Sequence, residues 1–304
     1  MKHLVTLYDL TPADAVEIFQ LAADLKRDLT AGKRPSPLAG YVLTQVFEKP
    51  SLRTRLSFEA AMMQLGGSSI FLSRKDAGLE GRESHADVAR VIGGYSDVIV
   101  LRTFARSLIE EFAQHSGCAI INGLSDDDHP CQALTDLFTI QEAFGSLKGH
   151  KLAYIGDGNN VAASLAVCCA MFGVPYSLAT PPGYELRPQV RAEIQRRYPA
   201  AKIEQHTDPK AAVKGADVIY TDVWASMGQE NEKDQRAQIF APYQVNAALM
   251  KAAQPGAKFM HCLPARRGQE VTDEVIDAPT SIAFPQAENR MHLAKGLLLW
   301  LLRK

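Results

Sequence analysis

The sequence predicts an α/β protein made of two domains, each a doubly wound parallel sheet. Three observations predict this class. The chain has 304 residues, more than a single hydrophobic core usually supports. Its short apolar runs alternate with segments of helical period, the pattern of parallel strands connected by helices. The same alternation occurs before residue 145 and again after it.

Nine apolar runs are candidate strands. They are residues 41–47, 69–72, 97–101 and 118–121 in the first half, and 151–155, 176–179, 202–205, 217–221 and 258–261 in the second. The helical stretch 131–144 runs into Gly145 to Gly149, which ends a helix before a new strand begins. We therefore expect a first domain over residues 1–145, a helix that joins it to a second domain over 146–285, and a terminal helix over 286–304.

Composition narrows the class of function. A chain that is 46% hydrophobic and 22% charged is ordinary for a globular protein, which excludes extensive disorder. A net charge of −1 creates no overall field that would recruit nucleic acid or an anionic membrane, so we expect neither partner. The five cysteines lack a paired CxxC pattern, no signal peptide is evident and the apolar runs are too short to span a bilayer. These features predict a cytoplasmic protein.

The first chemical motif is Ser51-Leu52-Arg53-Thr54-Arg55, between a strand and a helix. Ser51 is a good N-cap, and the N-terminus of a helix attracts anions. Arginine forks beside that end suit phosphate. The alternative is a solvated first turn, but the helix dipole disfavours arginine there. The motif therefore predicts a local anion site.

A second group, His129-Pro130-Cys131-Gln132, opens the helix over 131–144. An imidazole could polarise a carbonyl oxygen, and the Gln132 amide could hold an amino group. Alone, such a group more often reflects turn and capping chemistry at a helix start. Arg102, at the end of the strand over 97–101, is a third candidate.

Three segments follow strands in the second half, at residues 156–160, 222–228 and 261–268. The first contains Gly156 and Gly158, but Val161 replaces the third glycine of a dinucleotide fingerprint, so we expect no NAD. Asp222 could pair with a substrate ammonium. Cys262 could present a thiol or nearby carbonyls, although nothing in the spacing indicates a covalent cysteine mechanism. A zinc site of His129, Cys131, His261 and Cys262 matches no standard spacing, so we expect no metal.

Together these motifs resemble the ornithine-using branch of the carbamoyltransferase family. Ser-x-Arg-Thr-Arg and His-Pro-x-Gln are similar to the wider family, whereas Asp222-Val-Trp-Ala-Ser-Met-Gly and His261-Cys-Leu-Pro are similar to the ornithine branch. The resemblance implies transfer of the carbamoyl group of carbamoyl phosphate to the δ-amine of L-ornithine, which yields L-citrulline and phosphate without a cofactor. It also implies a carbamoyl phosphate domain followed by an ornithine domain, a terminal helix that returns to the first domain, and trimers or multiples of trimers.

The resemblance assigns roles to individual residues. Carbamoyl phosphate would be bound by Ser51, Leu52, Arg53, Thr54, Arg102, His129, Gln132, Cys262, Leu263 and Arg290. Ornithine would be bound by Asn160, Asp222, Ser226 and Met227. Arg102, His129 and Cys262 would be the catalytic residues. One position departs from the family pattern: Gly78 stands where relatives carry a glutamine that reaches a neighbouring subunit, and Arg82 in the same loop could replace it.

Other acceptors and a non-catalytic role are the alternatives. Aspartate is disfavoured because Asp222 would repel its second carboxylate. An N-acylated ornithine lacks the ammonium that Asp222 would bind, yet one loop shift could accommodate it. A non-catalytic anion-binding protein would need only the first motif, so the presence of His129, Gln132, Asp222 and Cys262 argues against it.

Overall fold

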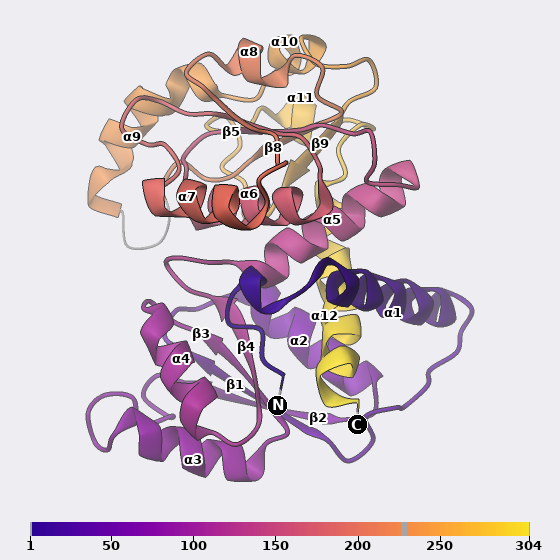
Figure 1. Cartoon of the computed structure of the whole chain (residues 1–304), viewed down its shortest axis with the longest axis vertical. Helices are drawn as coiled ribbons and strands as arrows, with labels where there is room; N and C mark the ends of the chain where they lie inside the picture. The colour runs from indigo at the N-terminus through magenta and orange to yellow at the C-terminus, as the bar shows by residue number, and fades with distance from the viewer. Residues whose placement is uncertain (1, 226–229, 304) are drawn as a thin grey trace. The chain divides into compact units, whose positions relative to one another are not determined.

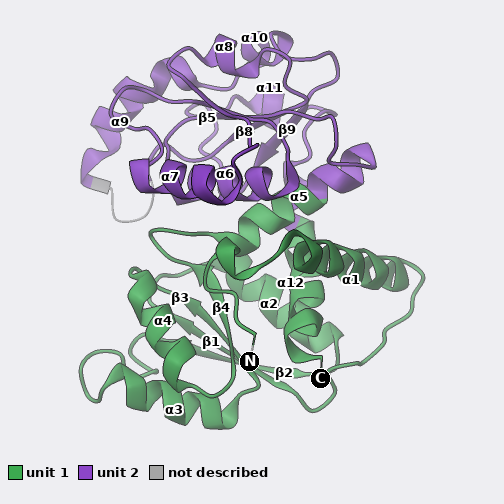
Figure 2. Ribbon diagram, in the orientation of Figure 1, with its two compact units in different colours: residues 1–138, 288–304 green, residues 139–287 purple. Residues whose placement is uncertain are grey.

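The computed structural model describes residues 2–225 and 230–303. The chain divides into two compact units, drawn in green and purple in Figure 2. Unit 1 comprises Met1–Phe138 and Glu288–Lys304, and unit 2 comprises Thr139–Ala287. Both divisions fall within helices, α5 (Pro130–Phe144) and α12 (Ala283–Leu302).

Unit 1 contains a four-stranded parallel sheet in the order β2-β1-β3-β4. The strands are β1 (Val42–Phe47), β2 (Ser68–Ser73), β3 (Val98–Arg102) and β4 (Ala119–Leu124). Its other elements are η1 (Leu7–Asp9), α1 (Pro12–Thr30), α2 (Leu52–Gln64), α3 (His85–Tyr95) and α4 (Arg106–His115). One face of the sheet packs against α3 and α4, where Ile99 and Leu101 belong to the same buried hydrophobic cluster as Val88 and Phe112.

Unit 2 contains a five-stranded parallel sheet in the order β7-β6-β5-β8-β9. The strands are β5 (Leu152–Ile155), β6 (Tyr176–Ala179), β7 (Ile203–His206), β8 (Val218–Thr221) and β9 (Lys258–His261). The helical elements are α6 (Asn160–Phe172), α7 (Pro188–Arg197), α8 (Pro209–Val213), η2 (Glu230–Glu232), α9 (Lys233–Phe240), η3 (Ala241–Tyr243), α10 (Ala247–Lys251) and α11 (Asp273–Ile276). Residues from α8 to α11 bury Ile219 and Phe259 on one face.

These two parallel sheets confirm the predicted fold class. Most strands both begin and end within one residue of the expected apolar run. The exception is β4, which extends to Leu124 through Asn122 and Gly123. Asn122 and Gly123 interrupt the apolar run, so the sequence pattern did not predict this extension. In this part of the strand, β4 pairs with β3 through a register shift between Leu101 and Arg102.

The terminal helix packs within unit 1, as expected. Figure 1 shows α12, in yellow, beside α1. Gly296 makes this approach possible, since a Cβ at that position would lie 2.4 Å from the carbonyl oxygen of Ile18. A residue with a side chain at Gly296 would therefore force the two helices apart.

The strand orders place the loops that carry the chemical motifs. In each sheet, successive strands are added first on one side of the initial strand and then on its other side. This change of side falls between β1 and β3 in unit 1 and between β5 and β8 in unit 2. Crevices at the carboxyl ends of such strands are the usual ligand sites of open α/β sheets. Ser51 and Arg102 lie at the first point, and Asn159 and Asp222 lie at the second.

None of the helices in residues 2–225 and 230–303 combines the length and the hydropathy that crossing a bilayer requires.

Candidate functional site

The anion motif of unit 1 folds as a capped helix start. Ser51 is the N-cap of α2 in an extended conformation, and its Oγ accepts a hydrogen bond from the backbone nitrogen of Thr54 at 3.3 Å. The same hydroxyl donates to Thr54 Oγ1 at 3.0 Å. Leu52 begins the helix with its side chain exposed, so its backbone is at the helix end. The expected anion-attracting helix terminus is present.

Arg102 carries a buried guanidinium whose hydrogen-bond donors are not all satisfied. It ends β3 at the register shift and is 6% exposed, and its Nε has no hydrogen-bond partner. Among the described residues no carboxylate pairs with it. Burial first, and then the charges of Arg290 and Arg53, lower the pKa of Arg102 to about 10. An isolated buried cation is costly, so a dianion placed here would be strongly favoured.

Arg55 does not join this cluster. Its Nε donates to Glu59 Oε1 at 2.9 Å, and its guanidinium stacks 3.9 Å from the ring centre of Phe71. One helical turn brings Glu59 beside it, which explains the pairing. The second arginine that accompanies Arg53 is therefore Arg102 or Arg290 rather than Arg55.

His129 is held neutral. It is 7% exposed, immediately before α5. Burial, followed by the charges of Arg290, Arg102 and Arg53, lowers its pKa well below 6.5. A neutral imidazole carries one N–H, which can donate to a carbonyl oxygen without adding a charge.

Arg290 and Gln132 complete a group of side chains in unit 1 that we call the unit 1 cluster. Its other members are Arg53, Thr54, Arg102 and His129. Arg290 Nη1 donates to Gln132 Oε1 at 2.6 Å, and its Nη2 lies 3.4 Å from Thr54 Oγ1. Gln132 Nε2 in turn donates to Asp136 Oδ1 at 2.7 Å. The motifs from α2, α5 and α12 therefore meet, although they are separated by up to 236 positions in the sequence.

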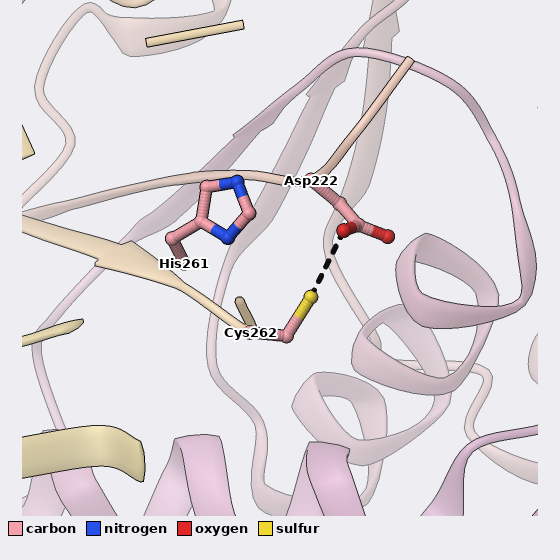
Figure 3. Close-up of side chains that lie close together, drawn as sticks. All are labelled: Asp222, His261 and Cys262. Carbon is pink, nitrogen blue, oxygen red and sulfur yellow. Dashed lines mark hydrogen bonds between the residues drawn. The ribbon is translucent and has the colours of Figure 1, made fainter. Parts of the chain in front are cut away.

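Unit 2 gathers a second group around Asp222, which follows β8. Figure 3 shows the thiol of Cys262 directed at this carboxylate, with Sγ 3.0 Å from Oδ1. Asn159 Nδ2 donates to Oδ2 at 3.0 Å, and the backbone nitrogen of Val223 donates to Oδ1. Asp222 is 7% exposed, and within the described part of the chain it has no cationic partner. It is a buried anion surrounded by neutral donors.

His261 supports the loop that carries Cys262. Its Nδ1 accepts from the backbone nitrogen of Leu263 at 2.8 Å, and its Nε2 lies 3.3 Å from Glu270 Oε1. Leu263 has a φ of 57°, which is uncommon for a residue with a side chain. Both ring nitrogens of fully buried His261 are thus used to hold this turn.

Asp222, His261 and Cys262 each offer a potential metal ligand, and these atoms lie within 4.8 Å of one another. The arrangement does not suit a metal well, because His261 would first have to give up its contact with Leu263 or with Glu270.

Arg236 anchors the chain after Asp222. Its Nη1 donates to Asp157 Oδ2 at 2.7 Å and to the carbonyl oxygen of Trp224 at 2.8 Å. The guanidinium also lies over the ring of Tyr184. The contacts of Arg236 tie α9 to the loops that end β5 and β8.

Some predicted residues fall elsewhere. Ser226 and Met227 lie outside the described residues. Asn160 begins α6, but it is the preceding Asn159 that caps this helix and contacts Asp222. Sequence reasoning missed Asn159, Asp136, Arg236 and Glu270. An i, i+4 spacing from Gln132 to Asp136 was a usable signal for one of them.

Two family models match the chain. The carbamoyl-P binding domain of aspartate/ornithine carbamoyltransferases matches residues 2–142, and the Asp/Orn binding domain of the same enzymes matches residues 148–301. The chain belongs to the aspartate/ornithine carbamoyltransferase family.

Relatives within this carbamoyltransferase family cover the whole chain. The ornithine carbamoyltransferase of Bacillus subtilis is 50% identical over 306 residues, which is 100% of this chain and 94% of the relative. That of Pyrococcus abyssi is 48% identical and covers 99% of this chain and 96% of its own length. The solved structure of ornithine carbamoyltransferase from Pyrococcus furiosus has a TM-score of 0.96 at 46% identity, covering 99% of this chain and 97% of that one.

Proposed function

We propose that the protein is an ornithine carbamoyltransferase, which transfers the carbamoyl group of carbamoyl phosphate to the δ-amine of L-ornithine and releases L-citrulline and phosphate. One observation carries the proposal. Unit 1 buries a guanidinium, Arg102, that has no anion among the described residues, and unit 2 buries a carboxylate, Asp222, that has no cation. The first requires an anionic substrate and the second requires a substrate ammonium.

Carbamoyl phosphate meets the requirement of unit 1, where we place it in the domain of residues 1–145 completed by the helix of 286–304. Its phosphate oxygens suit Ser51, the backbone of Leu52, Arg53, Thr54 and Arg102. The neutral imidazole of His129 donates to the carbamoyl oxygen, and Gln132 accepts from the carbamoyl nitrogen. Arg290 has only donors, so it supports Gln132 and Thr54 rather than accepting from that nitrogen.

Ornithine meets the requirement of unit 2, in the domain of residues 146–285. Asp222 binds the α-ammonium, while Asn160, Ser226 and Met227 hold the α-carboxylate side of the molecule. Cys262 lies beside the amino group through its contact with Asp222. These roles favour ornithine over an N-acylated ornithine, which has no α-ammonium for Asp222.

The reaction needs charge stabilisation more than acid–base chemistry. The neutral δ-amine attacks the carbamoyl carbon, and an oxyanion develops on the carbonyl oxygen. Donors from Thr54, Arg102 and His129 stabilise that charge, and the arginines neutralise the departing phosphate. The leaving phosphate can accept the proton that the amine loses.

We propose that the protein assembles as a homotrimer or a multiple of trimers. Large apolar side chains stand exposed on one helix and on the neighbouring edge strand of unit 1: Leu52, Leu56 and Met63 on α2, and Ile70 on β2. Exposed apolar groups gathered this way are typical of a protein interface. Arg82, in the loop before α3, then takes the place of the missing glutamine at Gly78 in the neighbouring subunit's site. Since none of the five cysteines, all of which lie in the described residues, forms a disulfide, we also propose a cytoplasmic location.

Dialysed protein incubated with carbamoyl phosphate and L-ornithine tests the proposal. We expect citrulline and phosphate in equal amounts, with no added metal or cofactor. Phosphate release that is independent of ornithine, with no citrulline, would contradict it.

A further inference from the structure

Gln132 lies between two groups with opposite hydrogen-bonding capacity. Its Oε1 accepts from Arg290 Nη1 at 2.6 Å, and its Nε2 donates to Asp136 Oδ1 at 2.7 Å. Asp136 follows Gln132 by one turn of α5, so its carboxylate reaches the amide along the helix. All three side chains are buried, with Asp136 at 0%, Gln132 at 3% and Arg290 at 4% exposure.

This arrangement allows only one orientation of the Gln132 amide. A guanidinium can only donate, and the Asp136 oxygen that faces the amide accepts from it. If the amide turned over, its NH₂ would face Arg290 and its oxygen would face Asp136, so both contacts would become repulsive. Asp136 and Arg290 therefore keep the carbonyl oxygen of Gln132 on the side of Arg290 and Thr54.

A carbonyl oxygen has two lone pairs, and Arg290 uses one of them. The second lone pair can accept a hydrogen bond from a ligand bound at the unit 1 cluster. The other members of the cluster, Arg53, Arg102, Thr54 and His129, offer hydrogen-bond donors to that ligand. The Gln132 oxygen is thus an acceptor in a site otherwise lined by donors.

We propose that Asp136 is a positioning residue that makes this site prefer carbamoyl phosphate to acetyl phosphate. This inference rests on the proposed function for the identity of the ligand. The two phosphates differ only in an NH₂ or a CH₃ on the carbonyl carbon. Carbamoyl phosphate satisfies the free lone pair of Gln132, whereas the methyl group leaves a buried oxygen without a donor, which is costly.

Removal of the acceptor at position 136 leaves the Gln132 NH₂ without its partner. Only the contact with Arg290 then opposes rotation of the amide, so the orientation that presents N–H groups to the ligand's own NH₂ becomes more populated. Carbamoyl phosphate loses a hydrogen bond and meets a like donor, while acetyl phosphate loses nothing. The preference between the two ligands therefore falls although phosphate binding is retained.

Calorimetric titration with carbamoyl phosphate, acetyl phosphate and inorganic phosphate, all without ornithine, tests this. Wild-type protein should bind carbamoyl phosphate more tightly than acetyl phosphate. Asp136→Leu should reduce that ratio by about ten-fold, with the Kd for inorganic phosphate nearly unchanged. Asp136→Asn is the matched control, because its Oδ1 still accepts from Gln132; most of the preference should remain. A ratio that survives in Asp136→Leu, or that falls equally in both variants, would overturn the proposal.

The double variant Gln132→Met/Asp136→Leu keeps the test decisive if Asp136→Leu alone does not fold, because removing both polar partners leaves neither unsatisfied. Its ratio should equal that of Gln132→Met alone, since Asp136 acts through Gln132. A further fall in the double variant would show that Asp136 acts elsewhere and would contradict the proposal. Wild-type protein that binds no carbamoyl phosphate would instead refute the proposed function.

Discussion

The Cys262 thiol donates a hydrogen bond to the Asp222 carboxylate, with Sγ and Oδ1 3.0 Å apart. The contact orients Asp222, whose other oxygen accepts from Asn159. Asp222 is thereby presented as a fixed anion for a substrate cation.

Asp222→Asn should weaken the recognition of ornithine. Because a buried charge pair with the substrate ammonium is lost, the KM for ornithine should rise at least about 30-fold. The affinity for carbamoyl phosphate, measured by calorimetry without ornithine, should not change. Cys262→Ser is the matched comparison, since a hydroxyl still donates to Asp222, and its KM should rise less. An unchanged KM in Asp222→Asn would remove Asp222 from the acceptor site.

Arg102→Met should separate stability from binding. Without ligand, the variant should unfold at the same temperature as the wild type or higher, because an unpaired buried charge is gone. The increase in Tm that phosphate produces in the wild type should disappear. Arg55→Met, in the same motif but paired with Glu59, should keep the phosphate effect. A variant at Arg102 that still responds to phosphate would contradict the assigned role.

The lowered pKa of His129 predicts acid sensitivity of the ligand-free protein. Burial and nearby arginines hold the folded-state pKa well below 6.5, whereas the unfolded chain takes up a proton near that value. Above pH 6.5 neither state is protonated at His129, so stability is unaffected. Below it, only the unfolded state gains the proton, and stability falls by up to about 1.4 kcal/mol per pH unit.

Urea unfolding at pH 7.5, 6.5 and 5.5 measures this effect. His129→Gln should lose less stability than the wild type between pH 6.5 and 5.5, and the two slopes should agree above pH 6.5. Identical slopes throughout would show that His129 does not carry the acid sensitivity.

Arg82→Ala tests the contact between subunits. If Arg82 replaces the absent glutamine at Gly78, the variant should bind carbamoyl phosphate more weakly while its oligomeric state, measured by light scattering, stays the same. Glu80→Ala in the same exposed loop is a suitable control. Unchanged affinity in Arg82→Ala would refute the substitution of Arg82 for the glutamine.

The parallel-sheet fold was predictable because the core strands are continuous apolar runs. Val98 to Leu101 and Leu152 to Ile155 are buried at every position, so their pattern needs no tertiary information. Ser51 was predictable for a similar reason, since an N-cap acts on its own helix. The extension of β4 through Gly123 was not, because a Cβ there would crowd Leu101 of the neighbouring strand at 3.0 Å.

The supporting residues of the site were harder to predict. Arg236 and Glu270 act on Trp224 and His261 through contacts that only the folded chain creates. In the sequence, each resembles an ordinary charged residue of a helix or loop. Asn159 and Asn160 are adjacent, and only the start of α6 determines which of them caps the helix and meets Asp222. The role of each of two adjacent residues depends on the residue at which the helix begins. The pattern of residue types does not specify that residue.

The identity of the acceptor amine is the most direct test of the account. Purified protein with carbamoyl phosphate should be offered equal concentrations of L-ornithine, N-acetylornithine and L-aspartate in one mixture, and the carbamoylated products quantified by mass spectrometry. We predict citrulline in large excess over the other two products, because only ornithine brings an α-ammonium to Asp222 without a second carboxylate. A mixture dominated by N-acetylcitrulline or carbamoylaspartate would contradict the account.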